Sequence, residues 1–364
     1  MAVRLVEEMG SVRTDRKKGT LILEDGSLLE GHSFGSPKSA SGEIVFNTGM
    51  VGYLESLTDP SYKGQILVLT YPLIGNYGVP RSNGLHTAFE SDRIHIQGLI
   101  VSQYSFHYSH WNASKSLADW LIEHDVPALY GVDTRMLTKR IREKGAMLGK
   151  IVLSEVNQDF YDPNKDDLVP LVSVKQPIRY HRGNKQVVLI DCGCKESIIR
   201  SLLERDATVL RAPWDYNFFD EDFHGLVISN GPGDPTMCRE AILTVRRAME
   251  KGCAILGICL GHQILALAAG AHTYKLRFGH RSQNQPCIDV ERQRCYMTSQ
   301  NHGYAVAQDT LPQEWEPWFI NANDGTNEGI RHRSKPFMGV QFHPEGAPGP
   351  RDTGYIFDEF LSLL

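Results

Sequence analysis

The residue best placed for covalent chemistry is a cysteine between two glycines: Gly257, Cys259 and Gly261 form a G-x-C-x-G pattern. Residues 254–256 read as the end of a buried strand and residues 263–268 as the start of a helix, so a sharp strand-to-helix turn is expected. Glycines permit such a turn, and the positive end of a helix dipole stabilises a reactive thiolate. A buried structural cysteine is the alternative, but this context favours a nucleophile.

A thiolate nucleophile requires a base, and the base requires a group that orients it. Residues 337–342 resemble a strand and lead directly into His343, Pro344 and Glu345. Proline ends a strand ladder and keeps the preceding residue extended, which could direct both neighbouring side chains toward one site. Considered by itself, any one of the fourteen histidines would be read as an ordinary surface or core residue. Together with the cysteine turn, we interpret His343 as the base and Glu345 as its orienting carboxylate.

A third element could stabilise negative charge. Residues 226–229 read as a strand that opens into the glycine-rich loop 230–235, and a helix is expected over residues 237–250. Backbone N–H groups of this loop, with the amide of Leu260 behind the cysteine, could form an oxyanion hole. A plain connecting loop is the alternative.

The elements that must position these groups form an alternating series in the second half of the chain. Besides those above, strands are expected at residues 186–191 and 208–212, and a helix at 197–204. This order predicts an α/β fold with a doubly wound, mostly parallel sheet, whose ligands bind at the carboxyl ends of the strands. The cysteine, the histidine and the carboxylate all fall at such ends.

The first half is expected to form a separate mixed α/β domain. It begins with a hairpin at residues 21–28, where Asp25 and Gly26 suit a tight turn, and helices are expected at residues 116–123 and 134–143. Polar, loop-like runs lie between the halves. We therefore predict an N-terminal docking domain at 1–155, a linker region at 156–184 and a nucleophile-bearing domain at 185–364.

The chemistry-bearing motifs resemble those of the class I (triad) glutamine amidotransferases, which implies a flavodoxin-like C-terminal sheet. The similar segments are Gly-Ile-Cys-Leu-Gly-His-Gln at 257–263, Asn-Gly-Pro-Gly-Asp-Pro at 230–235 and Phe-His-Pro-Glu at 342–345. The resemblance implies that Cys259 attacks the carboxamide of L-glutamine, that His343 passes the proton to the leaving ammonia and that Glu345 orients His343. The other contacts it implies are the amides of Gly231 and Leu260 for the oxyanion, and Gln263 and Gly233 for the glutamine.

Further segments resemble the small subunit of carbamoyl-phosphate synthases, over nearly the whole chain from about residue 19. They lie at residues 45–53, 57–62, 70–78, 131–135, 274–286 and 298–304. The last of these implies that Asn301, Gly303 and Tyr304 also contact glutamine. Some small subunits have a substrate-contacting serine where Gly49 stands here, so any contact at Gly49 would come from its backbone.

The resemblance implies the glutaminase component of a glutamine-hydrolysing carbamoyl-phosphate synthase, which would channel ammonia to a large ATP-binding subunit. No phosphate-binding P-loop occurs in this sequence, so ATP and Mg²⁺ would be used by that partner, and this chain is expected to need no cofactor. A free-standing glutaminase or γ-glutamyl hydrolase would use the same residues and remains an alternative. A non-catalytic binding module is a further one. Whether the product serves pyrimidine or arginine synthesis stays open.

Composition fits a soluble two-domain enzyme. The chain has 364 residues, 41% of them hydrophobic, and a formal charge of −5, which gives no reason to expect binding to nucleic acid or an anionic membrane. Seven cysteines without paired spacing favour the reducing cytoplasm. His107 and His110 are close in sequence, but no cysteine or carboxylate accompanies them at ligand spacing, so no metal site is expected.

Overall fold

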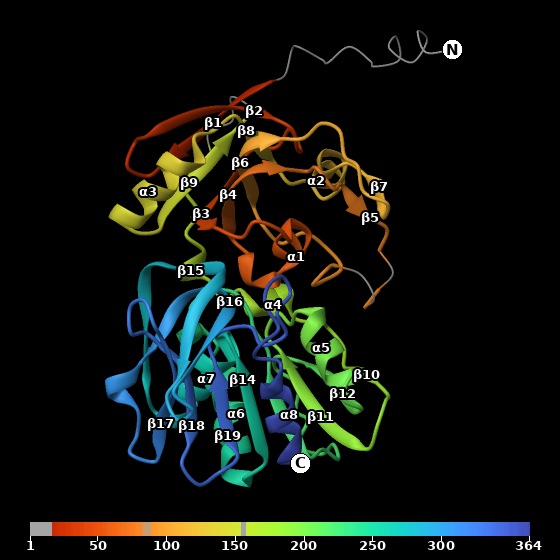
Figure 1. Cartoon of the computed structure of the whole chain (residues 1–364), viewed down its shortest axis with the longest axis vertical. Helices are drawn as coiled ribbons and strands as arrows, with labels where there is room; N and C mark the ends of the chain where they lie inside the picture. The colour runs from red at the N-terminus through yellow and green to blue at the C-terminus, as the bar shows by residue number, and fades with distance from the viewer. Residues whose placement is uncertain (1–16, 83, 86–87, 154–157) are drawn as a thin grey trace.

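The structure is a computed structural model, and it describes residues 17–364 except 83, 86–87 and 154–157. The N-terminal half forms a closed β-barrel, and the C-terminal half contains a ten-stranded sheet. Figure 1 shows the two bodies stacked along the long axis of the molecule, with β15 and α4 beside the barrel. The boundary predicted at residue 155 lies outside the described residues.

The barrel contains seven strands in the order β1-β2-β8-β6-β4-β3-β9, closed by the β1–β9 pairing. The strands are β1 (Lys18–Leu23), β2 (Leu28–Ser33), β3 (Ala40–Asn47), β4 (Gln65–Ile74), β6 (Gly98–Tyr104), β8 (Ala128–Tyr130) and β9 (Met147–Val152). A short pair, β5 (Val79–Pro80) and β7 (Ala113–Lys115), stands apart from them. The helices and 3-10 turn of this half are α1 (Tyr53–Thr58), η1 (Pro60–Tyr62), α2 (Leu117–Glu123) and α3 (Thr134–Lys144).

The mixed α/β character of this half was predicted, whereas closure of the barrel was not. The expected hairpin is β1–β2, in which the Leu23 amide donates to the Ser27 carbonyl at 2.9 Å and Gly26 has φ 84°. Both expected helices are present, and each begins at a polar cap: Ser116 accepts from the Asp119 amide, and Asp133 from the Met136 amide.

The C-terminal sheet has the order β10-β12-β11-β13-β14-β19-β18-β17-β15-β16. Its strands are β10 (Ile178–Tyr180), β11 (Lys185–Asp191), β12 (Ala207–Pro213), β13 (Gly225–Ile228), β14 (Ala254–Ile258), β15 (His272–Asp289), β16 (Arg294–Ala307), β17 (Trp315–Asn321), β18 (Asn327–His332) and β19 (Phe337–Val340). The helices are α4 (Val169–Val172), α5 (Glu196–Leu203), α6 (Arg239–Lys251), α7 (Leu260–Ala269) and α8 (Tyr355–Ser362), with 3-10 turns η2 (Pro163–Lys165), η3 (Pro235–Met237) and η4 (Gln308–Thr310).

The doubly wound arrangement follows because apolar side chains of the central strands point alternately to the two faces of the sheet. The five strands β12, β11, β13, β14 and β19 are parallel. In β11, Val188 and Ile190 pack in the apolar cluster that includes α6 and α7, whereas Val187 and Leu189 pack in the cluster that includes α5 and α8. Because successive side chains of a strand point to opposite faces, helices cover both faces of the sheet.

Polar contacts join the two bodies. Lys275 of β15 pairs with the buried Glu43 of β3 at 2.6 Å. The Arg277 carbonyl accepts from the Ala146 amide at 2.7 Å, and Glu90 accepts from Arg200 of α5 at 2.9 Å. Among the described residues, no helix combines the length and the apolar character needed to cross a membrane.

Candidate active site

Cys259 occupies the turn between β14 and α7 in a strained conformation. It has φ 54° and ψ −105°, a region that non-glycine residues rarely adopt. Its amide donates to the Val340 carbonyl of β19 at 2.8 Å, and its carbonyl accepts from the Gln263 amide of α7 at 3.2 Å. Such backbone strain persists where the surroundings hold it in place and is typical of functional sites.

The two flanking glycines are required by close backbone approaches. A Cβ atom at Gly261 would lie 2.1 Å from the Ile228 carbonyl oxygen, and one at Gly257 would lie 2.5 Å from the Gly261 carbonyl oxygen. Neither distance is compatible with a side chain. The G-x-C-x-G pattern is therefore the sequence consequence of packing α7 directly against β13 and β14.

His343, Glu345 and a lysine form a buried chain of charged groups. Glu345 Oε1 lies 2.6 Å from His343 Nδ1 and 2.8 Å from Lys195 Nζ. Strand β16 helps to hold the imidazole, because the His343 amide donates to the Ser299 carbonyl at 2.9 Å. Lys195 directly precedes α5, and its side chain is 3% exposed. Since the lysine holds the carboxylate and the carboxylate holds the imidazole, the orientation of His343 is fixed from two sides.

The charges in this chain shift one another's ionisation. Burial opposes the imidazolium form of His343, but the neighbouring Glu345 carboxylate outweighs burial and raises the pKa of His343. Burial likewise opposes ionisation of Glu345, yet Lys195 and His343 hold the pKa of Glu345 below its usual range. The neighbouring Cys259 side chain is a further cause that raises the pKa of His343. The arrangement thus favours a positively charged imidazole beside the thiol.

The glycine-rich loop after β13 lies against the same turn. A Cβ atom at Gly231 would lie 2.1 Å from the Cys192 carbonyl oxygen and 2.7 Å from Leu260 Cδ2, so this backbone packs tightly. Gly233 has φ 88°, which favours glycine. Leu260 is the first residue of α7, and the first N–H groups of a helix have no acceptor within it. The loop and the helix start can therefore offer donors to an anion at Cys259.

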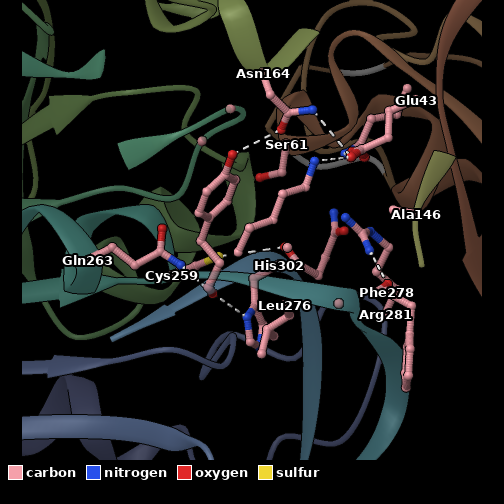
Figure 2. A pocket seen from close by; sticks show the side chains of 18 residues that line it. Glu43, Ser61, Ala146, Asn164, Cys259, Gln263, Leu276, Phe278, Arg281 and His302 are labelled. Carbon is pink, nitrogen blue, oxygen red and sulfur yellow. Dashed lines mark hydrogen bonds and ion pairs between the residues drawn. The ribbon is translucent and has the colours of Figure 1, made fainter. Parts of the chain in front are cut away.

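A pocket beside Cys259 collects most of the residues predicted from sequence (Figure 2). Its wall includes Gly231, Gly233, Cys259, Gln263, Asn301, Gly303 and Tyr304. Gln263 Nε2 donates to the Tyr304 carbonyl at 2.8 Å and to Gln341 Oε1 at 2.9 Å, so it also ties α7 to β16 and to the segment after β19. The Leu260 side chain packs in the apolar core, which leaves only its backbone for the site.

Gly49 does not line this pocket, and its contact with glutamine stays a prediction. Gly49 lines a neighbouring cavity, and a Cβ atom there would meet the Gln283 side chain at 2.6 Å. Four residues of the barrel half do line the pocket: Glu43, Ser61, Gln65 and Ala146. Ser61 lies on the turn after α1. The segment around Ser61 resembles the small-subunit domain, but its position against Cys259 depends on how the two halves pack.

Two other residues of the site were not identified from sequence. Arg281 of β15 is buried in the pocket wall, and its Nη1 donates to the Phe278 carbonyl at 2.9 Å, so it brings a positive charge to which a carboxylate can bind. Lys195 lies at the carboxyl end of β11, the edge where a parallel sheet binds its ligands. That position was the one available signal for Lys195, and no residue pattern marked Arg281.

Comparisons with known families agree with this arrangement. Residues 188–363 match the family model described as "Glutamine amidotransferase class-I". Residues 21–151 match the model described as "Carbamoyl-phosphate synthase small chain, CPSase domain". The sheet, the cysteine turn and the first match define the C-terminal half as a class I glutamine amidotransferase domain. With both domains in this order, the chain belongs to the family of carbamoyl-phosphate synthase small chains.

Curated relatives match almost the entire chain. It is 53% identical over 352 residues to "Multifunctional protein CAD" of Squalus acanthias, covering 94% of this chain and 16% of that protein. It is 50% identical over 352 residues to "Carbamoyl-phosphate synthase [ammonia], mitochondrial" of Rattus norvegicus, covering 94% of this chain and 23% of that protein. It is 49% identical over 375 residues to "Multifunctional protein pyr1-3" of Dictyostelium discoideum, covering 95% of this chain and 17% of that protein. The chain therefore spans less than a quarter of the length of these relatives.

Proposed function

We propose that this chain hydrolyses glutamine for carbamoyl phosphate synthesis, with Cys259 as the nucleophile. The observation that carries the proposal is the strained Cys259 turn in a pocket wall beside the buried His343–Glu345 pair. The sulfur would attack the carboxamide carbon of glutamine and form a tetrahedral intermediate. Collapse of this intermediate would break the C–N bond, and His343 would give its proton to the departing ammonia. Water would then cleave the thioester and release glutamate.

The pocket supplies the other groups that this reaction needs. The amides of Gly231 and Leu260 would stabilise the oxyanion of the tetrahedral intermediate. Gln263, Asn301, Gly303 and Tyr304, with the Gly233 loop, would hold the glutamine, and Ser61 would contact it from the barrel. The buried guanidinium of Arg281 would bind the α-carboxylate. Gly49, which lines the neighbouring cavity, would contact glutamine only through its backbone.

The ammonia would pass to an ATP-binding large component, either a separate subunit or the remainder of a longer polypeptide. Free ammonia released into water would be protonated and lose its nucleophilic lone pair, so an internal route is favoured. ATP and Mg²⁺ would be used in the large component, and this chain would need no cofactor of its own. The barrel would dock on the large component, and the reaction would take place in the cytoplasm.

The test is the Cys259→Ser variant, reconstituted with a large component of the synthase. Glutamine-dependent carbamoyl phosphate synthesis should be lost, while synthesis from added ammonium should persist, because only the first requires the thiol. Unchanged use of glutamine would contradict the proposal. Full glutaminase turnover by the wild-type chain alone, with no increase on adding the large component, would instead indicate a free-standing hydrolase.

A further inference from the structure

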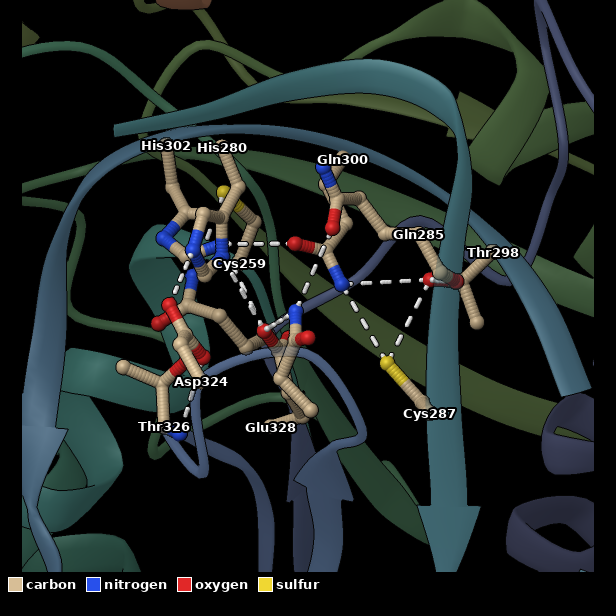
Figure 3. A network of polar contacts seen from close by, with 12 residues as sticks. Cys259, His280, Gln285, Cys287, Thr298, Gln300, His302, Asp324, Thr326 and Glu328 are labelled. Carbon is tan, nitrogen blue, oxygen red and sulfur yellow. Dashed lines mark hydrogen bonds and ion pairs between the residues drawn. The ribbon is translucent and has the colours of Figure 1, made fainter. Parts of the chain in front are cut away.

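Two buried histidines and a buried glutamate converge on the side of β16 that borders the Cys259 pocket. His280 of β15, His302 of β16 and Glu328 of β18 are each at most 7% exposed. One ligand atom from each of them lies within 4.8 Å of the others. Figure 3 shows this cluster, with dashed lines joining His280 to Asp324 and to Glu328. The proposed glutaminase reaction uses none of these three side chains.

The outer nitrogen of each imidazole already has a hydrogen-bond acceptor. His280 Nε2 lies 2.9 Å from Asp324 Oδ2, and His302 Nδ1 lies 2.8 Å from the Tyr304 carbonyl oxygen. When a neutral imidazole donates its one N–H in this way, the other ring nitrogen presents a lone pair. Metal-binding histidines almost always have this arrangement, in which a carboxylate or a backbone carbonyl fixes the tautomer.

The inner atoms of the cluster are then acceptors that face one another. His302 Nε2 lies 3.1 Å from Gln300 Oε1 and 3.9 Å from Glu328 Oε1. The Gln300 amide is held in this orientation because its Nε2 donates to Cys287 Sγ at 3.2 Å and to Thr298 Oγ1 at 3.1 Å.

The second carboxylate oxygen of Glu328 is buried and has no hydrogen-bond partner among the described residues. The other oxygen, Oε1, accepts from Asn321 Nδ2 at 3.1 Å and lies 3.2 Å from His280 Nδ1. Leaving a carboxylate oxygen buried without a partner is costly. A cation at the centre of the cluster would give this oxygen a partner.

The ligand set and spacing suit a zinc-like ion. Two imidazoles and one glutamate are a recurring zinc ligand set, with bonds of about 2.0–2.2 Å. A tetrahedral ion with bonds of about 2.1 Å separates its ligand atoms by about 3.4 Å. Glu328 Oε1 lies 3.2 Å from His280 Nδ1 and 3.9 Å from His302 Nε2, so small side-chain movements would complete the coordination. Gln300 Oε1 could act as a fourth ligand.

We propose that His280, His302 and Glu328 form a binding site for a divalent transition-metal ion of the zinc class. The ion would join β15, β16 and β18, three strands with no other cross-link of this kind among the described residues. His302 also lines the Cys259 pocket and directly follows Asn301. The ion would therefore stabilise the wall of the pocket from behind, outside the chemistry at Cys259. This site departs from the expectation, based on sequence, that the chain has no metal site.

The experiment uses the full chain carrying Cys259→Ser, since the free thiol of Cys259 would itself bind zinc. Calorimetric titration with zinc should show one ion per chain. X-ray absorption at the zinc edge should show two imidazoles and oxygen, with no sulfur. Because the spectrum is measured with all three ligands intact, it tests the site even if a ligand variant fails to fold. Absence of binding, or a sulfur ligand, would overturn the proposal.

Variants then assign the ligands in the same background. Glu328→Gln and His280→Gln should each weaken zinc binding by more than about tenfold. His272→Gln is the matched control, because this exposed histidine lies on the same strand, β15, and outside the cluster; it should leave binding unchanged. Equal affinity in the control and in both ligand variants would show that zinc binds elsewhere and would overturn the site.

Discussion

At the residue scale, the feature that most needs explanation is the buried row of charges formed by Lys195, Glu345 and His343. Two cations share one carboxylate away from water, so each charge depends on the others. The glutamate restrains the imidazole, and the lysine keeps the glutamate ionised. The row therefore governs both the protonation of His343 and the stability of the domain.

Glu345→Gln should move the pH dependence of glutamine hydrolysis. The carboxylate raises the pKa of His343, so its removal should lower that pKa, and the imidazolium that donates to ammonia should be lost at lower pH. The basic limb of the kcat/KM profile should shift toward acid. The control is Glu204→Gln, at the exposed end of α5. A basic limb that stays in place in the Glu345 variant would contradict this account of His343.

Lys195→Met should destabilise the folded chain. It leaves the Glu345 carboxylate buried with one of its two cationic partners missing, and breaking a buried ion pair costs about 3–5 kcal/mol. Urea unfolding should report a loss of this size in the free energy of unfolding. Lys165→Met is the control, since that side chain is 80% exposed and should change the same quantity by less than about 0.5 kcal/mol. Equal stability of the two variants would show that the ion pair contributes little to the free energy of unfolding.

At the element scale, the β14–α7 turn depends on close backbone packing. Gly261→Ala would place a methyl group 2.1 Å from the Ile228 carbonyl oxygen, so α7 would have to move away from β13. We expect a loss of more than about 3 kcal/mol in the free energy of unfolding, together with loss of glutaminase activity.

Gly252→Ala separates this clash from ordinary backbone strain. Gly252 has φ 74° and open space around a built Cβ atom, so this substitution should cost only about 1–2 kcal/mol. If the two alanine variants prove equally stable by urea unfolding, tight packing at Gly261 is not the reason for the glycine.

Several elements could be predicted from sequence because their signals are local. The predicted helix at 237–250 corresponds to α6 at Arg239–Lys251. The strand-to-helix turn at the cysteine is also present, but α7 begins at Leu260, three residues before the start inferred at 263. The long β15–β16 hairpin gave no such signal. Its pairing shifts register between Lys275 and His280 and again between Ser282 and Gln285, which interrupts the two-residue alternation on which strand prediction depends.

At the scale of the whole molecule, the barrel completes the pocket. The turn at Asp59 reaches across from the barrel: its Oδ2 accepts from Asn301 Nδ2 at 2.7 Å and its Oδ1 from Asn230 Nδ2 at 3.4 Å. Asp59 also caps the 3-10 turn that carries Ser61, whose hydroxyl accepts from Asn230 Nδ2 at 2.9 Å. A change in the barrel can therefore be transmitted to the glycine-rich loop and to β16.

Asp59→Ala should impair glutamine use without removing the nucleophile. Loss of hydrogen bonds to a charged group costs about 1.5–3 kcal/mol, which corresponds to a fall in kcat/KM of roughly 10–100-fold. Because Asp59 is a positioning residue, its loss should raise KM but leave the rate at which iodoacetamide alkylates Cys259 nearly unchanged. Asp92→Ala, at an 85% exposed barrel residue, should behave as the wild type. A faster or slower alkylation with unchanged KM would contradict the positioning role.

The part of the site that depends on this packing of the two halves could not be predicted from the sequence. Most pocket residues in the C-terminal half lie in motifs next to strand ends, so the order of elements was enough to gather them. Gly49 and Ser61 both lie in barrel segments that resemble the small-subunit domain, and sequence alone does not show which of them faces Cys259. Lys195 and the metal-ligand cluster are contacts between distant strands, and no local pattern marks them.

The most direct test of the central claim is to identify the covalent intermediate. The wild-type chain is mixed with glutamine, quenched in acid during turnover, digested and analysed by mass spectrometry. The account predicts a glutamyl group attached to the peptide that contains Cys259, and no such adduct in Cys259→Ser. An adduct on another residue, or hydrolysis of glutamine that continues in the serine variant, would contradict the assignment of Cys259 as the nucleophile.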